Sequence, residues 1–101
     1  MIVSTENPNV YKIEEKDLDI FSMSRFELEL DAVLNSSKIS LYLDFENVEQ
    51  ISSGIIGILL AKQMKLKKRG LAIELLHLSN SIKNILKILN LRDYFLSTNC
   101  L

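Results

Sequence analysis

The hydrophobic positions of the 101-residue chain change their period along its length, and each change predicts a new element. Short apolar runs at residues 2–5 and 10–14 flank the turn-forming residues 7–9, which together predict a β-hairpin. Residues 39–43 alternate with the two-residue period of a strand. Residues 71–76 form a nearly unbroken apolar run, which is typical of a buried strand.

Three other stretches carry the helical period. Ser24-Arg25-Phe26-Glu27 has the S-x-x-E form of a capping box and predicts a helix over residues 24–35. A second helix is predicted over residues 53–68, with Gly70 just past its C-terminus. Ser79 is suited to cap a third helix. The apolar face of that helix consists of Ile82, Ile85, Leu86 and Leu89.

The predicted order of elements is β-β-α-β-α-β-α, with a short edge strand at residues 94–96. Strands that alternate with helices imply parallel crossovers, whereas the opening hairpin adds an antiparallel pair. We therefore expect one α/β domain over residues 1–101. It should contain a mixed β-sheet of four or five strands, with helices packed mainly on one side.

The composition is that of a folded globular chain, with 48% hydrophobic and 25% charged residues. The longest apolar stretch, residues 55–61, is far shorter than the ~20 residues that span a bilayer. The first residues also lack the basic and apolar regions of a signal peptide. We therefore expect a cytoplasmic protein without direct membrane insertion, and the lone Cys100 fits a reducing compartment.

Charge is unevenly distributed along the chain. Residues 1–50 hold eleven acids and four bases, whereas residues 51–101 hold two acids and eight bases. Five of these bases end the second predicted helix, where cations complement the helix dipole and are interpreted as solvated. Because no aromatic residues are interleaved with them, we expect no nucleic-acid binding. The five are Lys62, Lys65, Lys67, Lys68 and Arg69.

Candidate catalytic and metal-binding groups are sparse. A zinc site takes about four ligands, and the single histidine, His77, has no cysteine or carboxylate at a recognisable spacing. Asp17 and Asp19 share one face of an extended segment, and with His77 they form the enzyme alternative. Since no further partner group is identifiable, we predict no catalytic residues, no metal, no cofactor and no enzyme activity.

The ordered motifs of the chain resemble those of the STAS family over about residues 10–96. Residues 41–48 are similar to the strand and turn before the family's phosphorylation loop. Residues 51–59 are similar to that loop and the following helix start, where the family usually has Asp-Ser-Ser-Gly-Leu-Gly. Asp17-Leu18-Asp19 lies where the family has Gly-Glu-Leu-Asp. The pattern is completed by residues 67–70, 85–91 and 94–95.

The resemblance implies a STAS-like sheet and the function of an anti-sigma factor antagonist. Such a protein binds a serine kinase-like anti-sigma factor and frees the sigma factor, until the kinase phosphorylates the second serine of the loop. Carried over by position, the phosphorylated residue is Ser53. The implied partner-binding residues are Asp19, Ser52, Gly54, Ile55, Ile56 and Gly57.

The physical case for a switch rests on the start of the second predicted helix. A phosphate adds roughly −1.5 to −2 charge, which free N–H groups and the helix dipole tolerate but a covering partner does not. Gly54 and Gly57 would keep this helix face low for a partner. We expect Ser53 to be exposed and Ile55 or Ile56 to be partly exposed. The alternative is that Ser52 and Ser53 are only N-cap residues.

Two positions depart from the family pattern. Ile51 replaces the aspartate that usually precedes the two serines, and that aspartate would cap the helix or orient the serine hydroxyl. Lys16 replaces the glycine that usually precedes the acidic segment. A STAS subunit that docks permanently needs no phosphorylated serine. The alternative function is therefore a docking subunit of a larger assembly, such as a lipid-transport ATPase complex or a signalling scaffold.

Overall fold

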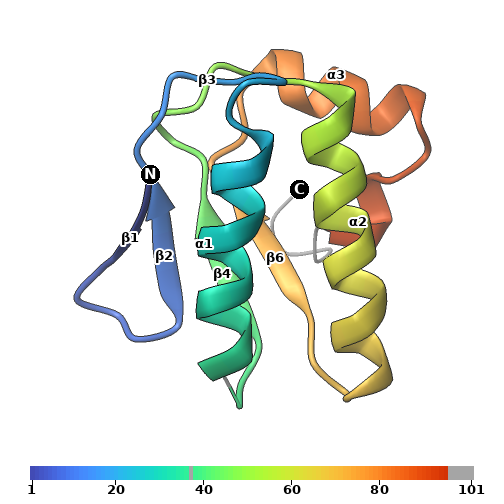
Figure 1. The fold of residues 1–101 in the computed structure, drawn as a ribbon. Helices are drawn as coiled ribbons and strands as arrows, with labels where there is room; N and C mark the ends of the chain where they lie inside the picture. Colours follow the sequence, from blue (N-terminus) through green and yellow to red (C-terminus); the bar gives the residue numbers. More distant parts are fainter. Residues whose placement is uncertain (37, 96–101) are drawn as a thin grey trace.

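The computed structural model describes residues 1–36 and 38–95 (Figure 1). Strands and helices alternate through most of this part of the chain, as the hydrophobic pattern predicts. The elements are β1 (Ile2–Ser4), β2 (Val10–Ile13), β3 (Asp17–Leu18), α1 (Met23–Ser36), β4 (Leu41–Asp44), β5 (Gln50–Ile51), α2 (Ser53–Lys68), β6 (Ile73–Leu76), α3 (Asn80–Ile88) and α4 (Arg92–Phe95).

The main sheet has four strands in the order β1-β2-β4-β6. β1 and β2 form the predicted antiparallel hairpin, while β2–β4 and β4–β6 are parallel pairs. The expected α/β fold with a mixed sheet of four or five strands is confirmed. β3 and β5 form a second, two-stranded parallel sheet that the sequence did not predict.

Helices α1 and α2 lie side by side on one face of the main sheet, and α3 lies at one end (Figure 1). Residues of β4 and β6 alternate between buried and half-buried, so one face of each strand packs into the core. The largest fully buried side chains come from every layer. They are Phe26, Phe45, Phe95, Ile13, Leu18, Leu30, Leu41, Leu43, Ile55, Leu59, Ile73 and Leu75.

Helix α2 begins and ends where the sequence predicts. At its C-terminus Gly70 has φ +74°, a left-handed conformation that glycine adopts without strain. The Gly70 N–H donates to the Lys67 carbonyl at 3.1 Å, and the Leu71 N–H donates to the Leu66 carbonyl at 2.9 Å. These two bonds close a Schellman motif and satisfy carbonyls that the helix end leaves free.

The predicted capping box at Ser24 is wrong. α1 begins at Met23, and its first helical bond runs from the Phe26 N–H to the Ser22 carbonyl at 2.9 Å. Ser24 therefore lies inside the first turn, where its side chain cannot cap the helix. By contrast, the predicted cap of α3 is confirmed, because the Ser79 Oγ accepts the Ile82 N–H at 3.2 Å.

The predicted edge strand at residues 94–96 is also wrong over its described part, because residues 92–95 form α4 and Leu96 lies outside the described residues. A buried glutamine explains why no strand pairs with β6 here. The Gln63 side chain accepts the Ile73 N–H at 2.7 Å and donates to the Ile73 carbonyl at 2.9 Å. It also donates to the Tyr94 carbonyl at 2.8 Å, which ties α4 to the edge of the sheet.

The prediction that the bases at the end of α2 are solvated is wrong for Lys62. Its ammonium is buried and lies 2.8 Å from an Asp31 oxygen and 2.9 Å from a Glu27 oxygen, so it joins α2 to α1. The hydrogen bonds to Asp31 and Glu27 raise the Lys62 pKa. The Lys67 ammonium forms a cation–π contact, because it lies 3.9 Å from the centre of the Tyr94 ring.

Candidate functional site

The serine loop, residues 52–54, lies at the start of α2. Ser52 is the N-cap: its backbone is extended (φ −80°, ψ 161°) and its Oγ accepts the Ile55 N–H at 3.3 Å. The Ser52 N–H in turn donates to the Leu18 carbonyl of β3 at 2.8 Å. Ser52 is half-buried, and both its hydroxyl oxygen and its backbone N–H take part in hydrogen bonds that hold the fold.

Ser53 is the first residue of α2 and is exposed, as expected. Because Ser52 supplies the cap, the Ser53 hydroxyl is not needed for it. Within residues 1–36 and 38–95 the Ser53 side chain makes no hydrogen bond. The first turn of α2 contains no acidic residue of its own to complement the positive end of the helix dipole beside Ser53.

The two glycines of the predicted partner surface have different surroundings. A Cβ on Gly54 would lie 2.5 Å from the Met23 sulfur and 2.6 Å from its terminal methyl carbon. Gly54 therefore allows the start of α1 to approach α2. A Cβ on Gly57 would meet nothing within 4 Å, and Gly57 is exposed. Only Gly57 fits the expected low, open helix face.

The expectation that Ile55 or Ile56 would be partly exposed is wrong. Their side chains are 0% and 3% exposed, because this turn of α2 faces the core. Ile51 is buried as well, since β5 pairs it with Leu18 of β3. An aspartate in place of Ile51 would thus put a carboxylate into the core in this structure, and Ser52 already caps the helix.

The small sheet brings Asp19 close to the serine loop. β3 and β5 pair Asp17 with Gln50 and Leu18 with Ile51, so segments more than thirty residues apart meet here. A shallow hollow of about 180 Å³ results. It is lined by Asp17, Leu18, Asp19, Gln50, Ile51 and Ser52. The predicted residues Asp19 and Ser52 therefore share one surface.

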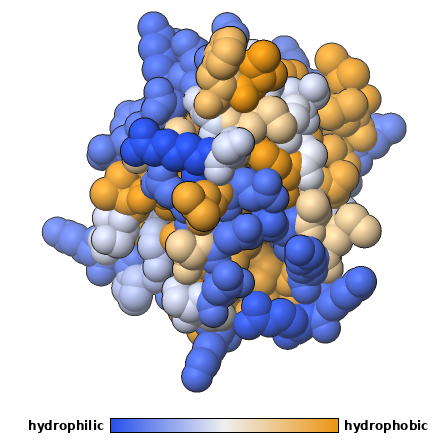
Figure 2. Space-filling model, in the orientation of Figure 1, coloured by the Kyte–Doolittle hydropathy of each residue, from blue (hydrophilic) through white to orange (hydrophobic). Residues whose placement is uncertain are grey.

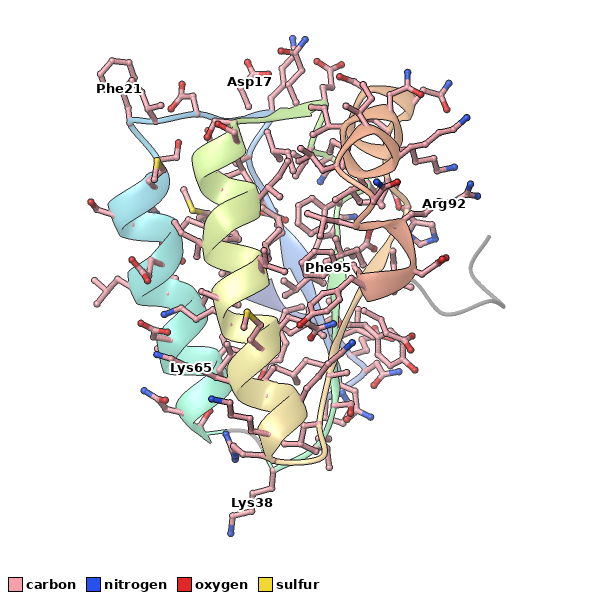
Figure 3. The ribbon with its side chains drawn as sticks, turned by 90° about the vertical axis from the view of Figure 1, so that its right-hand side faces the viewer. Asp17, Phe21, Lys38, Lys65, Arg92 and Phe95 are labelled. Carbon is pink, nitrogen blue, oxygen red and sulfur yellow. The ribbon has the colours of Figure 1, made fainter. Side chains whose placement is uncertain are left out.

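Asp19 itself fixes the turn before α1. Its Oδ1 accepts the Phe21 N–H at 2.9 Å and the Ser22 N–H at 3.2 Å. The turn presents Ile20 and Phe21, whose side chains are 66% and 89% exposed. Figure 3 shows Phe21 pointing away from the body of the molecule, at the end where Asp17 also lies.

Sequence reasoning missed this apolar tip, although two consecutive apolar residues outside any helical or strand period were a usable signal. Exposed apolar residues are ordinary when they are scattered. Figure 2 shows such scattered apolar side chains among polar ones on the face that carries α1 and α2. Phe21 differs because hydrogen bonds hold its backbone while its ring contacts solvent.

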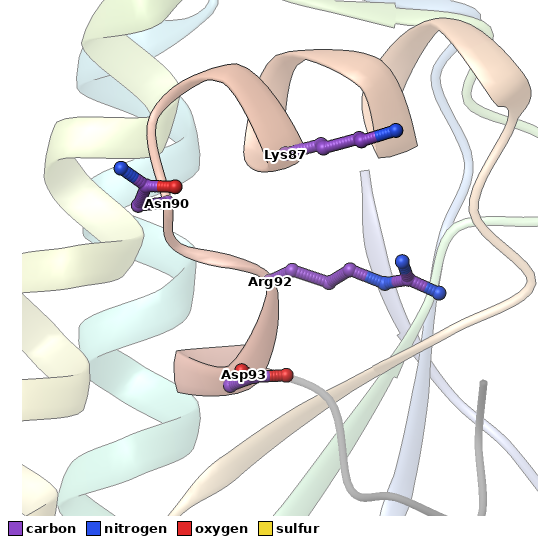
Figure 4. A pocket seen from close by; sticks show the side chains of 4 residues that line it. All are labelled: Lys87, Asn90, Arg92 and Asp93. Atoms are coloured by element: carbon purple, nitrogen blue, oxygen red, sulfur yellow. The ribbon is translucent and has the colours of Figure 1, made fainter.

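The structure does not bring the residues of the enzyme alternative together. His77 Nδ1 lies 3.0 Å from Asp44 Oδ1, whereas Asp17 and Asp19 line the hollow beside Ser52. In the described part of the chain, these three residues form no common cluster of metal-binding groups. A larger hollow of about 320 Å³ lies beside α4 and is lined by Lys87, Asn90, Arg92 and Asp93 (Figure 4). It contains no nucleophile paired with a base.

Comparison with protein families shows that the family model described as Mlab, STAS domain matches residues 15–98. The chain belongs to the STAS family. Comparison with solved structures finds the anti-sigma factor antagonist SpoIIAA in its unphosphorylated form, with a TM-score of 0.76 and 13% identity. The match covers 96% of this chain and 84% of the other, so the two share the STAS fold. Comparison with curated proteins gives no match.

Membrane-spanning helices are long and apolar. None of the helices in residues 1–36 and 38–95 is both long enough and apolar enough to cross a bilayer.

Proposed function

We propose that this STAS domain is an anti-sigma factor antagonist that acts in the cytoplasm and is switched off by phosphorylation of Ser53. Its partner is a serine kinase-like anti-sigma factor. The domain is the substrate of that kinase and performs no catalysis of its own.

The free Ser53 hydroxyl supports this proposal most directly. The alternative that both serines are cap residues accounts for Ser52 but leaves Ser53 without a structural role. A kinase can reach Ser53 without unfolding the helix, because the side chain is exposed and the cap stays in place. The likeness to SpoIIAA adds support at the level of the fold.

The proposed transfer adds one phosphoryl group. The Ser53 Oγ bonds to the γ-phosphorus of ATP, the bond to the β–γ bridging oxygen breaks, and the serine proton passes to a base of the kinase. ADP leaves. The product carries roughly −1.5 to −2 charge at the N-terminus of α2, where free N–H groups stabilise it in the unbound domain.

The same charge opposes the complex. A partner that covers the serine loop has to strip water from the phosphate, and an unpaired buried charge costs several kcal/mol. About 1.4 kcal/mol already lowers affinity tenfold. The partner surface proposed here combines the exposed turn before α1 with the exposed start of α2. It consists of Asp19, Ile20, Phe21, Ser53 and Gly57.

The test uses the full chain, the cognate anti-sigma factor kinase and ATP. Mass spectrometry should find one phosphate on Ser53, and titration calorimetry should find at least tenfold weaker binding for Ser53→Asp than for wild type. Ser53→Ala should bind like wild type and accept no phosphate. Ser81→Asp, which adds the same charge at an exposed serine in the first turn of α3, is the matched control.

A permanent docking subunit of a larger assembly, such as a lipid-transport ATPase complex, is the second candidate. Ile51 favours it, because the chain lacks the aspartate that usually precedes the serines in the family. Equal affinity of wild type and Ser53→Asp, together with an unphosphorylated Ser53, would support this second function and contradict the first.

A further inference from the structure

A second group of polar side chains lies at the C-terminal ends of two neighbouring parallel strands. Asp44 ends β4, and His77 directly follows β6. β4 and β6 pair in register, with Asp44 opposite Leu76, so the fold places the two side chains next to each other. Glu46 follows two residues after Asp44. Ligands of open α/β sheets commonly bind at such strand ends.

The three side chains are close enough to share one ion. The possible ligand atoms of Asp44, Glu46 and His77 all lie within 4.8 Å of one another. Two of them, His77 Nδ1 and Asp44 Oδ1, are 3.0 Å apart. Bonds of about 2.0–2.2 Å to a tetrahedral zinc ion place neighbouring ligand atoms roughly 3.4 Å apart. Glu46 is exposed, so its carboxylate can rotate over the remaining distance.

The backbone holds this arrangement in two ways. The Glu46 N–H donates to the Asp44 carboxylate at 2.9 Å, which orients Asp44. His77 has φ +55°, a conformation that is uncommon for residues other than glycine, although histidine is among those that adopt it more often. The turn aims the imidazole at Asp44, with the ring largely exposed to solvent.

We propose that Asp44, Glu46 and His77 form a binding site for a divalent transition metal, with zinc as the representative ion. One imidazole nitrogen and two carboxylates leave one position open for water, as in zinc sites with three protein ligands. The imidazole sets the selectivity, because Mg²⁺ and Ca²⁺ prefer oxygen ligands whereas zinc binds nitrogen well. The site contains none of the residues of the serine loop.

The sequence alone gave no such site, since thirty-three residues separate Asp44 from His77. The pairing of β4 with β6 brings the two residues together in space. Lys12 of β2 is also in register with Asp44, and its charge works against a bound cation. We therefore expect Lys12→Gln to strengthen metal binding.

The test uses the tag-free full chain carrying Cys100→Ser, which removes a thiol that also binds zinc. Titration calorimetry with zinc chloride and magnesium chloride should show zinc binding at least about tenfold tighter than magnesium. Because His77 is the only histidine, its imidazole NMR signals report the site without ambiguity. Zinc should shift those signals, and magnesium should not.

His77→Asn is the main variant, because asparagine tolerates the left-handed backbone but removes the imidazole. It should bind zinc at least about tenfold more weakly and lose the preference over magnesium. Glu46→Gln should also weaken zinc binding, whereas Asp17→Asn, an exposed acid outside the site, should not. Unchanged zinc affinity in His77→Asn, or zinc that binds without moving the His77 signals, would overturn the proposal. So would the absence of zinc binding at millimolar concentration.

Discussion

The structure uses the two adjacent serines at the start of helix α2 differently from two adjacent polar residues in its middle. At the start of the helix, Ser52 caps the backbone while Ser53 is exposed and unused. In the middle, Lys62 and Gln63 are both buried and both bonded to other elements. In the serine pair, only Ser52 has a structural role, and Ser53 is free. In the second pair, both Lys62 and Gln63 have structural roles.

This difference shows how a functional polar residue is recognised in a small domain. No described side-chain nitrogen or oxygen that is fully buried lacks a hydrogen-bond partner. Buried polar groups of this kind are explained by folding, because leaving one unsatisfied costs about 1–3 kcal/mol. An exposed hydroxyl at a helix start, with its cap supplied by a neighbour, has no such explanation. Ser53 is in that position, and this makes it the candidate for a switch.

The largest expected effect comes from Gln63→Ala. The truncation removes three hydrogen bonds and leaves the N–H and carbonyl of Ile73 unsatisfied at the edge of β6. We expect the free energy of unfolding to fall by about 3 kcal/mol, as measured by urea denaturation. The matched control is Gln50→Ala at an exposed position, where the change should stay within about 0.5 kcal/mol. Equal losses in the two variants would refute the structural role of Gln63.

Lys62→Met should have a smaller effect on stability. Methionine keeps the buried packing of the side chain but removes the ammonium from between Glu27 and Asp31. Because both carboxylates are partly exposed to solvent, we expect a loss of about 1 kcal/mol near pH 7. Lys65→Met, at an exposed position of the same helix, is the control and should leave stability nearly unchanged.

The pH dependence of the stability of Lys62→Met gives a second test of the ion pairs with Glu27 and Asp31. The Lys62 pKa is raised above its ordinary value of 10.5, mainly by the hydrogen bond to Asp31. The contribution of Lys62 to the free energy of unfolding is therefore complete below pH 10.5. It is lost as the pH rises through the higher pKa of the folded state. Denaturation curves should show the gap between wild type and Lys62→Met closing above pH 10.5. A gap that widens there would contradict the ion pairs.

Much of the main fold could be predicted from the sequence because its signals are local. Periodicity and caps located the hairpin, the strands β4 and β6, and both ends of α2. The errors came from tertiary contacts. Ser24 has the form of a cap, but the turn fixed by Asp19 starts α1 one residue earlier. Residues 94–95 have strand-forming character, but Gln63 occupies the edge that such a strand would join.

The candidate sites show the same limit. Ser53 was found because a short motif lies at a helix start, where cap chemistry is local. The burial of Ile55 and Ile56 depends on which face of α2 meets the sheet, and a helix that is apolar over most of its first turns does not reveal that face. The group of Asp44, Glu46 and His77 depends on the register between β4 and β6, which no local pattern carries.

The smallest expected effect separates the two serines directly. Ser52→Ala removes the hydroxyl that accepts the Ile55 N–H, and loss of an N-cap costs about 1 kcal/mol. Ser53→Ala removes a hydroxyl without a hydrogen bond among the described residues, and alanine is a good helix former. Its stability should therefore equal that of wild type or exceed it slightly. Thermal denaturation of both variants checks the pair, because a loss of 1 kcal/mol shifts the midpoint by roughly 4–8 °C in a domain of this size. If Ser53→Ala lost as much stability as Ser52→Ala, the Ser53 hydroxyl would have a structural role, and its availability to a kinase would lose its main support.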